Sequence, residues 1–449
     1  MKVLDFILSI MKTPAIVLGL VAMVGLILQK KNFGKVFSGT VKTAIGLLIL
    51  SAGAGLLVGE IIPFVNLFTS VFNLEGFATT SEGVVGAMQG AIPEIASASA
   101  LIMGIGFLVN ILLARFTPLK YIFLTGHMMW ILSVTVAFLL YVAGLGYTMM
   151  IVIGSVLQGM LMIILPALTQ PLVRKLTGND NFGIAHLTTL GTVPAGYIGG
   201  LLGNKEKDAE DLKMPKALEF FKDTTMSIAI VMGLFYVVLV LLAGPAKVAE
   251  FAGGQNYIIY GVLKALGFTA GILVLLYGVR MFLGELVPAF KGVSDKLVPG
   301  AIPALDVPAL FSYAPVSLMI GFVTSVVGMI VAMLVSSLVF GVVPLVSIIG
   351  AFFTGGVAGI FGNAKGGRRG AVIAGFVYGF LLIFGTAFLS TIYDFASFGA
   401  AGIGHDCIDA MAILTAFKLP IVGFILVPVV YVILSIFEVR RKKKATNAK

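Results

Sequence analysis

Charged residues are scarce in this 449-residue sequence, and cysteine and histidine are scarcer still. Asp, Glu, Lys and Arg make up only 11% of the chain, where soluble domains carry roughly 25%. Hydrophobic residues make up 59%. The single cysteine, Cys407, excludes an intramolecular disulfide and a cysteine metal cluster. The composition therefore excludes an ordinary soluble protein and predicts a polytopic membrane protein.

The common signatures of nucleotide and metal enzymes are also absent. The run GNAKGGRRG at 362–370 does not match the GxxxxGK[ST] phosphate loop, and no i, i+4 pair of ligands supports a zinc site. The net charge of +10 could indicate a nucleic-acid-binding protein, but Lys and Arg in membrane-protein loops serve to fix orientation. We therefore expect no cofactor, no metal and no nucleic-acid partner. We also expect no cleaved signal peptide, because no small-residue cleavage site follows the first apolar run.

Apolar stretches along the chain predict an all-α fold with about eleven transmembrane helices. They are 14–29, 43–67, 97–113, one that begins near 121, 149–172, 226–242, 257–283, 315–338, 344–361, 371–389 and 420–437. The connection 176–223 is long and polar, and its last part could form an amphipathic helix on the membrane surface.

The distribution of positive charge predicts an orientation. If the basic tail 438–449 is cytoplasmic, counting back through eleven spans places 25 of the 30 Lys and Arg residues in cytoplasmic loops. Positive residues concentrate on the cytoplasmic side of membrane proteins. The N-terminus is therefore expected outside and the C-terminus inside. The polar group formed by His405, Asp406, Cys407 and Asp409 then falls in an outer loop and is best explained as a solvated turn.

The stretch from Gly284 to Phe322 combines prolines with a carboxylate between hydrophobic spans. Its prolines are Pro288, Pro299, Pro303, Pro308 and Pro315, and the carboxylate is Asp306. Proline interrupts the hydrogen bonds of a helix, and unpaired backbone is not tolerated against lipid. The stretch is therefore expected to be buried in protein or to line a wet cavity, where transporters place their substrate sites.

Two short sequence blocks recur in the same order. GEIIP at 59–63 matches GELVP at 284–288, and GAIP occurs at both 90–93 and 300–303. In the topology above, the second span runs outward and the seventh inward. The pattern therefore predicts an inverted repeat, which is common in alternating-access carriers. The alternative is a chance match among glycine-rich apolar segments.

Four polar side chains fall at or near membrane depth, where each is costly unless it has a function. His127 begins the fourth span, His186 lies in NFGIAHL, Asp306 lies in the proline-rich stretch, and Glu94 follows the first GAIP. A carboxylate beside two imidazoles can bind a polyhydroxylated ligand through hydrogen bonds. The alternatives are hydrogen-bonded core histidines or a metal site formed by the two histidines and Asp306.

Six motifs point to a known family: FLTGHMM at 123–129, NFGIAHL at 181–187, GVRMFLGEL at 278–286, LVPGAIPALD at 297–306, YAP at 313–315 and FGNAKGGRRGA at 361–371. Through them nearly the whole chain resembles the ascorbate-type membrane subunits (IIC components) of the bacterial phosphoenolpyruvate-dependent sugar phosphotransferase system. The resemblance implies a homodimer in the bacterial inner membrane, with re-entrant hairpins and a core that crosses the membrane as a rigid body, like an elevator. It also implies that a soluble IIB subunit carrying a phosphocysteine, supplied by a IIA subunit, phosphorylates the substrate.

The same resemblance implies a division of the chain into domains. Residues 1–67 and 224–290 would form a dimer-forming domain of V-shaped helices. Residues 68–223 and 291–437 would form the transport core, and 438–449 a basic cytoplasmic tail.

The family's two site histidines correspond to His127 and His186, and its site aspartate to Asp306. In the ascorbate transporters, glutamine stands four residues after the first histidine and directly after the second. Here these positions hold Ile131 and Leu187. A pocket that hydrogen-bonds a substrate hydroxyl changes its preference when an amide becomes aliphatic. The substrate is therefore ascorbate or another pentose- or hexose-derived sugar.

Two other functions remain compatible with these residues. An ion-coupled carrier could use Asp306 or Glu94 as a proton site on the same scaffold. A membrane enzyme or receptor without transport is disfavoured by eleven spans, an inverted repeat and the lack of a Ser-His-Asp or metal constellation. The sequence leaves open whether the chain itself is an enzyme, because the resemblance places the phosphoryl carrier on another chain.

Overall fold

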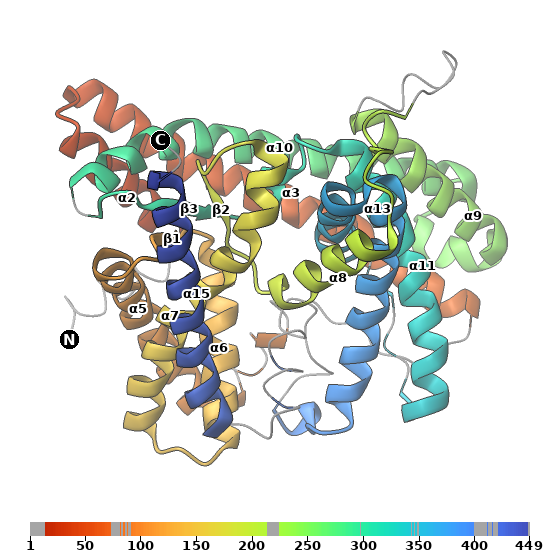
Figure 1. Ribbon diagram of the computed structural model, residues 1–449. Coiled ribbons are helices and arrows are strands. Elements are labelled where there is room, and N and C mark those ends of the chain that lie inside the picture. The colour runs from red at the N-terminus through yellow and green to blue at the C-terminus, as the bar shows by residue number, and fades with distance from the viewer. Residues whose placement is uncertain are drawn as a thin grey trace.

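The computed structural model describes residues 14–72, 81, 84–85, 88, 91–212, 224–296, 298–342, 344, 346–347, 350–398, 411, 415 and 421–447. Helices dominate these residues (Figure 1). The long ones are α2 (Pro14–Leu28), α3 (Phe33–Phe72), α5 (Pro93–Phe116), α6 (Gly126–Val142), α7 (Tyr147–Thr177), α8 (Thr189–Leu202), α9 (Thr224–Ala252), α10 (Tyr257–Lys296), α11 (Pro315–Phe340), α13 (Gly356–Ser390) and α15 (Ile421–Asn447). Short helical segments are η2 (Val307–Leu310), η3 (Ala351–Gly355) and η4 (Phe395–Phe398).

Apolar helices of membrane-spanning length confirm the predicted class. Among the described residues, five helical stretches are long and apolar enough to cross a membrane: Pro93–Phe116, Tyr147–Thr177, Met232–Ala252, Pro315–Phe340 and Ala351–Ser390. Two shorter apolar helical stretches are Gly126–Val142 and Tyr257–Gly271. The chain is an all-α membrane protein, whereas the count of eleven spans stays a prediction.

Several predicted boundaries were wrong. The fourth apolar stretch begins as a strand at 121–123, and its helix starts only at Gly126. Helix α10 continues from Gly284 to Lys296 through Pro288, because one missing hydrogen bond does not end a long membrane helix. The connection 176–223 contains a strand and helix α8, which sequence reasoning missed because threonine and glycine make α8 look weakly polar. The amphipathic helix expected at the end of this connection lies outside the described residues.

Helices α3 and α10 form an antiparallel pair of 40 residues each. They run side by side along the upper edge of the molecule (Figure 1) and pack with α2 and α9. Near one end of the pair, Lys264 lies 2.8 Å from Glu60. Near the other end, Glu285 lies 3.6 Å from Lys35 and 3.4 Å from Lys42. Lys35 and Lys42 lie within α3, whereas the predicted spans 14–29 and 43–67 left both residues in a connecting loop.

Helix α13 is a hairpin that reverses at a glycine pair. Gly367 has a φ of 61°, in the left-handed region that favours glycine. A Cβ atom added to Gly362 would lie 2.6 Å from the Cβ of Ala374. In a straight helix, twelve residues would separate them by about 18 Å. The two arms are therefore antiparallel and correspond to the separate stretches 344–361 and 371–389 expected from the sequence.

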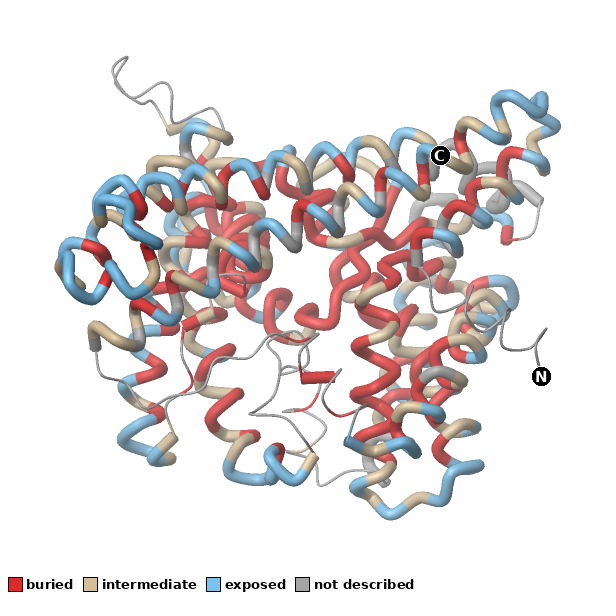
Figure 2. Tube along the Cα trace, turned by 180° about the vertical axis from the view of Figure 1, so that it is seen from behind, coloured by how far each residue is buried: buried red, intermediate tan, exposed pale blue. Residues whose placement is uncertain are grey.

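Small residues let α8 and α11 approach this hairpin closely. A Cβ atom on Gly196 of α8 would lie 2.7 Å from the Cβ of Phe361, and one on Gly321 of α11 would lie 2.7 Å from the Cα of Gly359. Small residues at such contacts are typical of membrane helices, whose association depends on close packing. Helices α8, α11 and α13 thus form one interior group. Helices α5, α6 and α7 form a second, with α15 packed on α7. In both groups the buried residues face the middle of the molecule (Figure 2).

A small parallel sheet lies among these helices and was not predicted. Its strands are β1 (Tyr121–Phe123), β2 (Gly183–Ile184) and β3 (Ile302–Leu305), in the order β1-β3-β2. At the β1 edge, the buried amide of Asn110 in α5 donates to the Tyr121 carbonyl and accepts from the Phe123 N–H, both at 3.1 Å. At the other edge, the Gln170 amide donates to the Phe182 carbonyl at 3.2 Å. Side-chain amides thus satisfy backbone groups that lipid could not.

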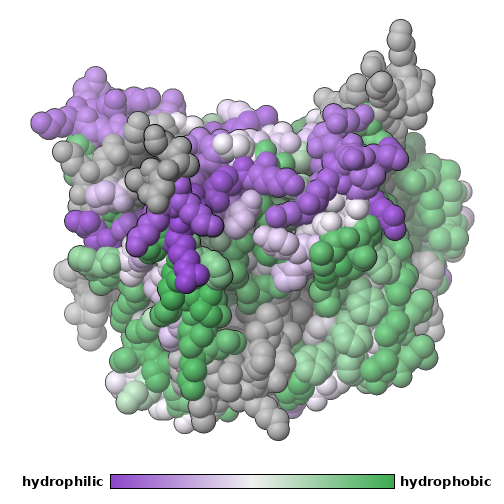
Figure 3. All heavy atoms as spheres, in the orientation of Figure 1, coloured by the Kyte–Doolittle hydropathy of each residue, from purple (hydrophilic) through white to green (hydrophobic). Residues whose placement is uncertain are grey.

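Polar loops gather on one side of the molecule (Figure 3). Lys175, near the end of α7, lies close to Lys365 and Lys205. The pKa of Lys120 is lowered by burial and by Lys442 and Arg115. These residues are among the cations expected in cytoplasmic loops and the cytoplasmic tail, and the structure gathers them in two groups.

Candidate functional site

The carboxyl ends of the three strands place three of the predicted residues at one edge of the sheet. Asp306 directly follows β3, His186 follows β2 after one residue, and His127 follows β1 after a three-residue turn into α6. Parallel strands point their carboxyl ends the same way, and a crevice at that edge is where ligands bind in open parallel sheets. The sheet therefore brings together residues that are up to 179 positions apart in the sequence.

The central strand β3 tolerates Pro303 because the neighbouring strand β2 begins to pair with β3 only after this residue. The N–H of Ile302 donates to the Lys120 carbonyl on the β1 side at 2.8 Å. Successive residues alternate sides, so the next position, Pro303, faces the β2 side. Strand β2 pairs only with Ala304 and Leu305, so no partner for the missing N–H of Pro303 is needed there. Strand β3 therefore leads directly to Asp306, and Pro303 costs the sheet no hydrogen bond.

Asp306 lies between the two imidazoles. Its Oδ2 atom is 3.6 Å from Nε2 of His127, and its Oδ1 atom is 3.9 Å from Nε2 of His186. Both distances are longer than a direct hydrogen bond, so a hydroxyl group or a water can bridge each gap. The side chain of His127 is 34% exposed, that of Asp306 12% and that of His186 4%. His127 is therefore the accessible member of the cluster and His186 the deepest.

The backbone around Asp306 fixes the carboxylate. Oδ1 accepts a hydrogen bond from the N–H of Val307 at 2.7 Å, and so caps the 3-10 segment η2. The carbonyl of Asp306 accepts from the N–H of Ala309 at 3.0 Å. The middle of the proline-rich stretch, residues 302–310, is thus a strand and a turn, and most of these residues are buried.

The other predicted site residues do not join this cluster through any described contact. Ile131 and Leu187 are fully buried, one turn after His127 and directly after His186. Glu94 is exposed in the first turn of α5, about 24 Å along that helix from Asn110, which contacts β1. The outer loop with His405 lies outside the described residues. Within the described part of the chain, no group of three or more His, Cys, Asp or Glu side chains is arranged to hold a metal ion.

Loop 203–212 holds the helices next to the site, and sequence reasoning missed it. The carboxylate of Glu210 accepts from the backbone N–H groups of Val316 at 3.1 Å and Ser317 at 2.8 Å, at the start of α11. The buried amide of Asn363 donates to Asp208 at 2.7 Å and accepts from the N–H of Ala209 at 2.9 Å. The available signal was a single amide, Asn363, within a glycine-rich apolar run.

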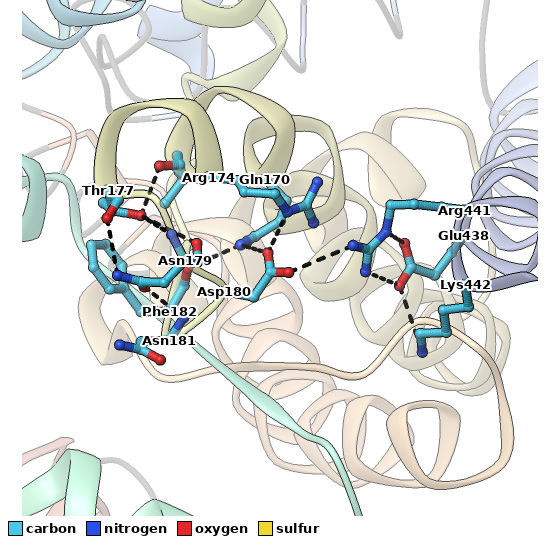
Figure 4. Close-up of polar contacts among 11 residues, drawn as sticks. Gln170, Arg174, Thr177, Asn179, Asp180, Asn181, Phe182, Glu438, Arg441 and Lys442 are labelled. Carbon is cyan, nitrogen blue, oxygen red and sulfur yellow. Dashed lines mark hydrogen bonds and ion pairs between the residues drawn. The ribbon is translucent and has the colours of Figure 1, made fainter. Parts of the chain in front are cut away.

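A second missed network ties the C-terminal helix to the turn before β2 (Figure 4). The Oδ1 atom of Asp180 accepts from Nε of Arg174 at 2.8 Å and from the Gln170 amide at 2.9 Å. Arg441 of α15 lies 3.6 Å from Oδ2 of Asp180 and also pairs with Glu438 at 2.7 Å. Burial alone would raise the pKa of Asp180, but the hydrogen bonds and the two arginines lower it below its ordinary value.

A multi-pass helical bundle that encloses a carboxylate between two imidazoles defines a membrane protein with an internal polar site. The chain belongs to the family of PTS system sugar-specific permease components (EIIC-GAT), whose family model matches residues 9–407. This confirms the family inferred from the sequence motifs.

One curated relative is the "Ascorbate-specific PTS system EIIC component" of Mycoplasma pneumoniae, which is 28% identical to this chain over 428 residues. The match covers 84% of this chain and 64% of the relative, so the chain spans somewhat less than two thirds of that protein's length.

Proposed function

We propose that this protein is the permease subunit of a sugar phosphotransferase system and binds an ascorbate-like or related sugar at His127, His186 and Asp306. The observation that carries this proposal is the carboxylate that faces one imidazole on each oxygen, across gaps of 3.6 and 3.9 Å. A sugar hydroxyl can donate to the carboxylate and accept from an imidazole at the same time. The family and the printed name of the Mycoplasma pneumoniae relative support a sugar or ascorbate as the ligand.

The neighbours of the two histidines bear on which sugar is bound. Ile131 and Leu187 are both buried where the ascorbate pattern has glutamine. An aliphatic side chain offers no hydrogen bond to a substrate hydroxyl, so the pocket favours a sugar with fewer polar groups at these two places. Glu94, which is exposed in the first turn of α5, is not included in the site that we propose.

The transport mechanism that we propose is an elevator movement of the core against a dimer-forming domain. Helices α2, α3, α9 and α10 lie mostly within residues 1–67 and 224–290, pack with one another and fit the dimer-forming domain. The elements that carry the site lie in the remainder, 68–223 and 291–437. The protein would be a homodimer in the bacterial cytoplasmic membrane, with its N-terminus outside and its C-terminus inside.

An inverted repeat would relate the two halves. The antiparallel pair α3 and α10 supports it, because the matching residues Glu60 and Glu285 make matching contacts at opposite ends. Glu60 contacts Lys264, and Glu285 lies beside Gly39, which is the position that corresponds to Lys264 at an offset of 225. The second block does not support the repeat, because Pro93 begins helix α5 whereas Pro303 lies in strand β3.

Coupling to phosphorylation would require soluble partners. A IIB subunit with a phosphocysteine, recharged by a IIA subunit, would phosphorylate the bound sugar from the cytoplasm. The clustered cations of the polar side, such as Lys365 and Arg368, offer a surface that favours an anionic partner.

Uptake into sealed vesicles tests this function. Vesicles that contain the protein are given labelled L-ascorbate, pentoses and hexoses, with and without the phosphorylated IIB subunit. We expect one sugar to accumulate as its phosphate only when the phosphorylated subunit is present. The variant Asp306→Asn should lose this uptake, and Asp394→Asn, at an exposed carboxylate, should keep it. Accumulation of free sugar without the subunit, driven by a proton gradient, would instead establish an ion-coupled carrier.

A further inference from the structure

The hydrogen bonds of His186 determine which of its ring nitrogens carries the proton. Nδ1 lies 3.3 Å from the backbone nitrogen of Thr188, whose N–H points at it, and 2.8 Å from the hydroxyl oxygen of the same residue. A backbone N–H can only donate, so Nδ1 must be an acceptor. In a neutral imidazole the other nitrogen then carries the proton. The geometry therefore corresponds to the tautomer with the proton on Nε2.

Local structure keeps Thr188 in place. Its side chain is buried, and the residue is the N-cap of α8. The carbonyl of Thr188 accepts from the N–H of Thr192 at 2.9 Å and from the Thr192 hydroxyl at 3.0 Å. The hydroxyl of Thr189 donates to the carbonyl of His186 at 2.7 Å. The start of α8 thus fixes both the histidine backbone and the donor groups that face Nδ1.

This tautomer limits what can bind between His186 and Asp306. Nε2–H is a donor, and Oδ1 of Asp306, 3.9 Å away, is an acceptor. A ligand group that bridges them must accept from the imidazole and donate to the carboxylate. A hydroxyl does both, whereas an ammonium group cannot accept and a carboxylate cannot donate.

We propose that Thr188 is a positioning residue that holds His186 as an Nε2–H donor, so that the site selects a ligand hydroxyl shared between His186 and Asp306. The tautomer stands on the structure alone, and the selection of a hydroxyl rests on the proposed function. The two parts are therefore tested by separate measurements.

Nuclear magnetic resonance tests the tautomer on the full-length protein in lipid nanodiscs with ¹⁵N-labelled histidine. The chain has only three histidines, so single substitutions of His127 and His405 assign the signals of His186. We expect Nδ1 to show the chemical shift of an unprotonated nitrogen and Nε2 that of a protonated one. Thr188→Val keeps the backbone N–H but removes the closer hydroxyl at 2.8 Å, so the population of the Nε2–H tautomer should fall, and Thr188→Ser should restore it. A wild-type spectrum with the proton on Nδ1, or an unchanged spectrum in Thr188→Val, would overturn the role of Thr188.

Amide substitutions of His186 test the donor at Nε2. The amide nitrogen of His186→Gln can take the place of Nε2, whereas that of His186→Asn takes the place of Nδ1. We measure binding of L-ascorbate, pentoses and hexoses to each variant in nanodiscs. We expect the sugar that binds the wild-type protein to have about tenfold higher affinity for His186→Gln than for His186→Asn, because one hydrogen bond is retained. Equal affinities would overturn the donor role. If the tautomer is as proposed but no sugar binds the wild type, the proposed function and the hydroxyl selection fail together.

Discussion

At the scale of single residues, the carboxylate of Asp306 is the centre of the proposed site. It is 12% exposed and faces two imidazoles. Replacement by asparagine keeps its shape but removes the charge, so Asp306→Asn should weaken sugar binding by about 1–3 kcal/mol. His127→Ala and His186→Ala should each weaken binding while the protein stays folded. Titration calorimetry gives the affinities, and the thermal unfolding temperature serves as the control for folding. Normal binding by the alanine variants would show that the site lies elsewhere.

The residues that follow the two histidines give a second prediction, about specificity. Ile131→Gln and Leu187→Gln place amides at buried positions, where an unsatisfied amide costs about 1–3 kcal/mol. Hydrogen bonds from a substrate to these amides offset this cost. We therefore expect the double variant to be destabilised when empty and to shift its preference toward ascorbate. Competition binding with L-ascorbate against pentoses and hexoses measures the preference. An unchanged order of affinities would mean that these positions do not contact the substrate.

At the scale of helices and strands, the sequence predicted that apolar helices dominate the fold, and it did not predict the sheet. A periodic apolar run of twenty residues carries enough information to predict a helix. Strand β2, by contrast, has two residues, Gly183 and Ile184, and no pattern is visible at that length. The sequence nevertheless singled out His127, His186 and Asp306 as candidates, because polar side chains are rare at membrane depth. Their meeting at one edge could not be predicted from composition, since it depends on a parallel register between distant segments.

The contact between α15 and the turn before β2 gives a prediction about pH. Arg174, Gln170 and Arg441 hold the pKa of Asp180 below its ordinary value, so this contact stabilises the fold above the ordinary carboxyl pKa. The contribution is lost as the pH falls through the lowered pKa. We expect acidification below the lowered pKa of Asp180 to release the end of α15. Asp180→Asn should loosen the same contact even at neutral pH. Distances between spin labels on α7 and α15 report the release, with Asp211→Asn, at an exposed carboxylate, as the control.

At the scale of the whole molecule, clustered cations distinguish the polar side from the rest of the surface. Lys365 lies over the ring of Tyr197 at 4.6 Å, and Arg368 and Arg369 are exposed at the tip of the α13 hairpin. Such a group steers an anionic partner toward the membrane surface. Reversal of these three charges should slow phosphorylation of the sugar by the IIB subunit and leave sugar binding intact. Lys247→Glu, at an exposed cation on the predicted outer side, is the matched control. Equal loss of binding and phosphorylation would rule out a docking role.

The orientation of the whole chain gives the last prediction. The basic end of α15 contacts the turns that follow α5 and α7, because Lys442 donates to the Pro118 carbonyl at 3.3 Å and Arg441 pairs with Asp180. These turns therefore lie on the same side of the membrane as the tail. Since positive residues remain in the cytoplasm during insertion, that side should be cytoplasmic. A reporter fused after Lys449 should be active only in the cytoplasm, and one inserted at Gly253, in the exposed turn between α9 and α10, only outside. Two reporters active on the same side would require an even number of membrane crossings between these positions and would contradict the eleven-span topology.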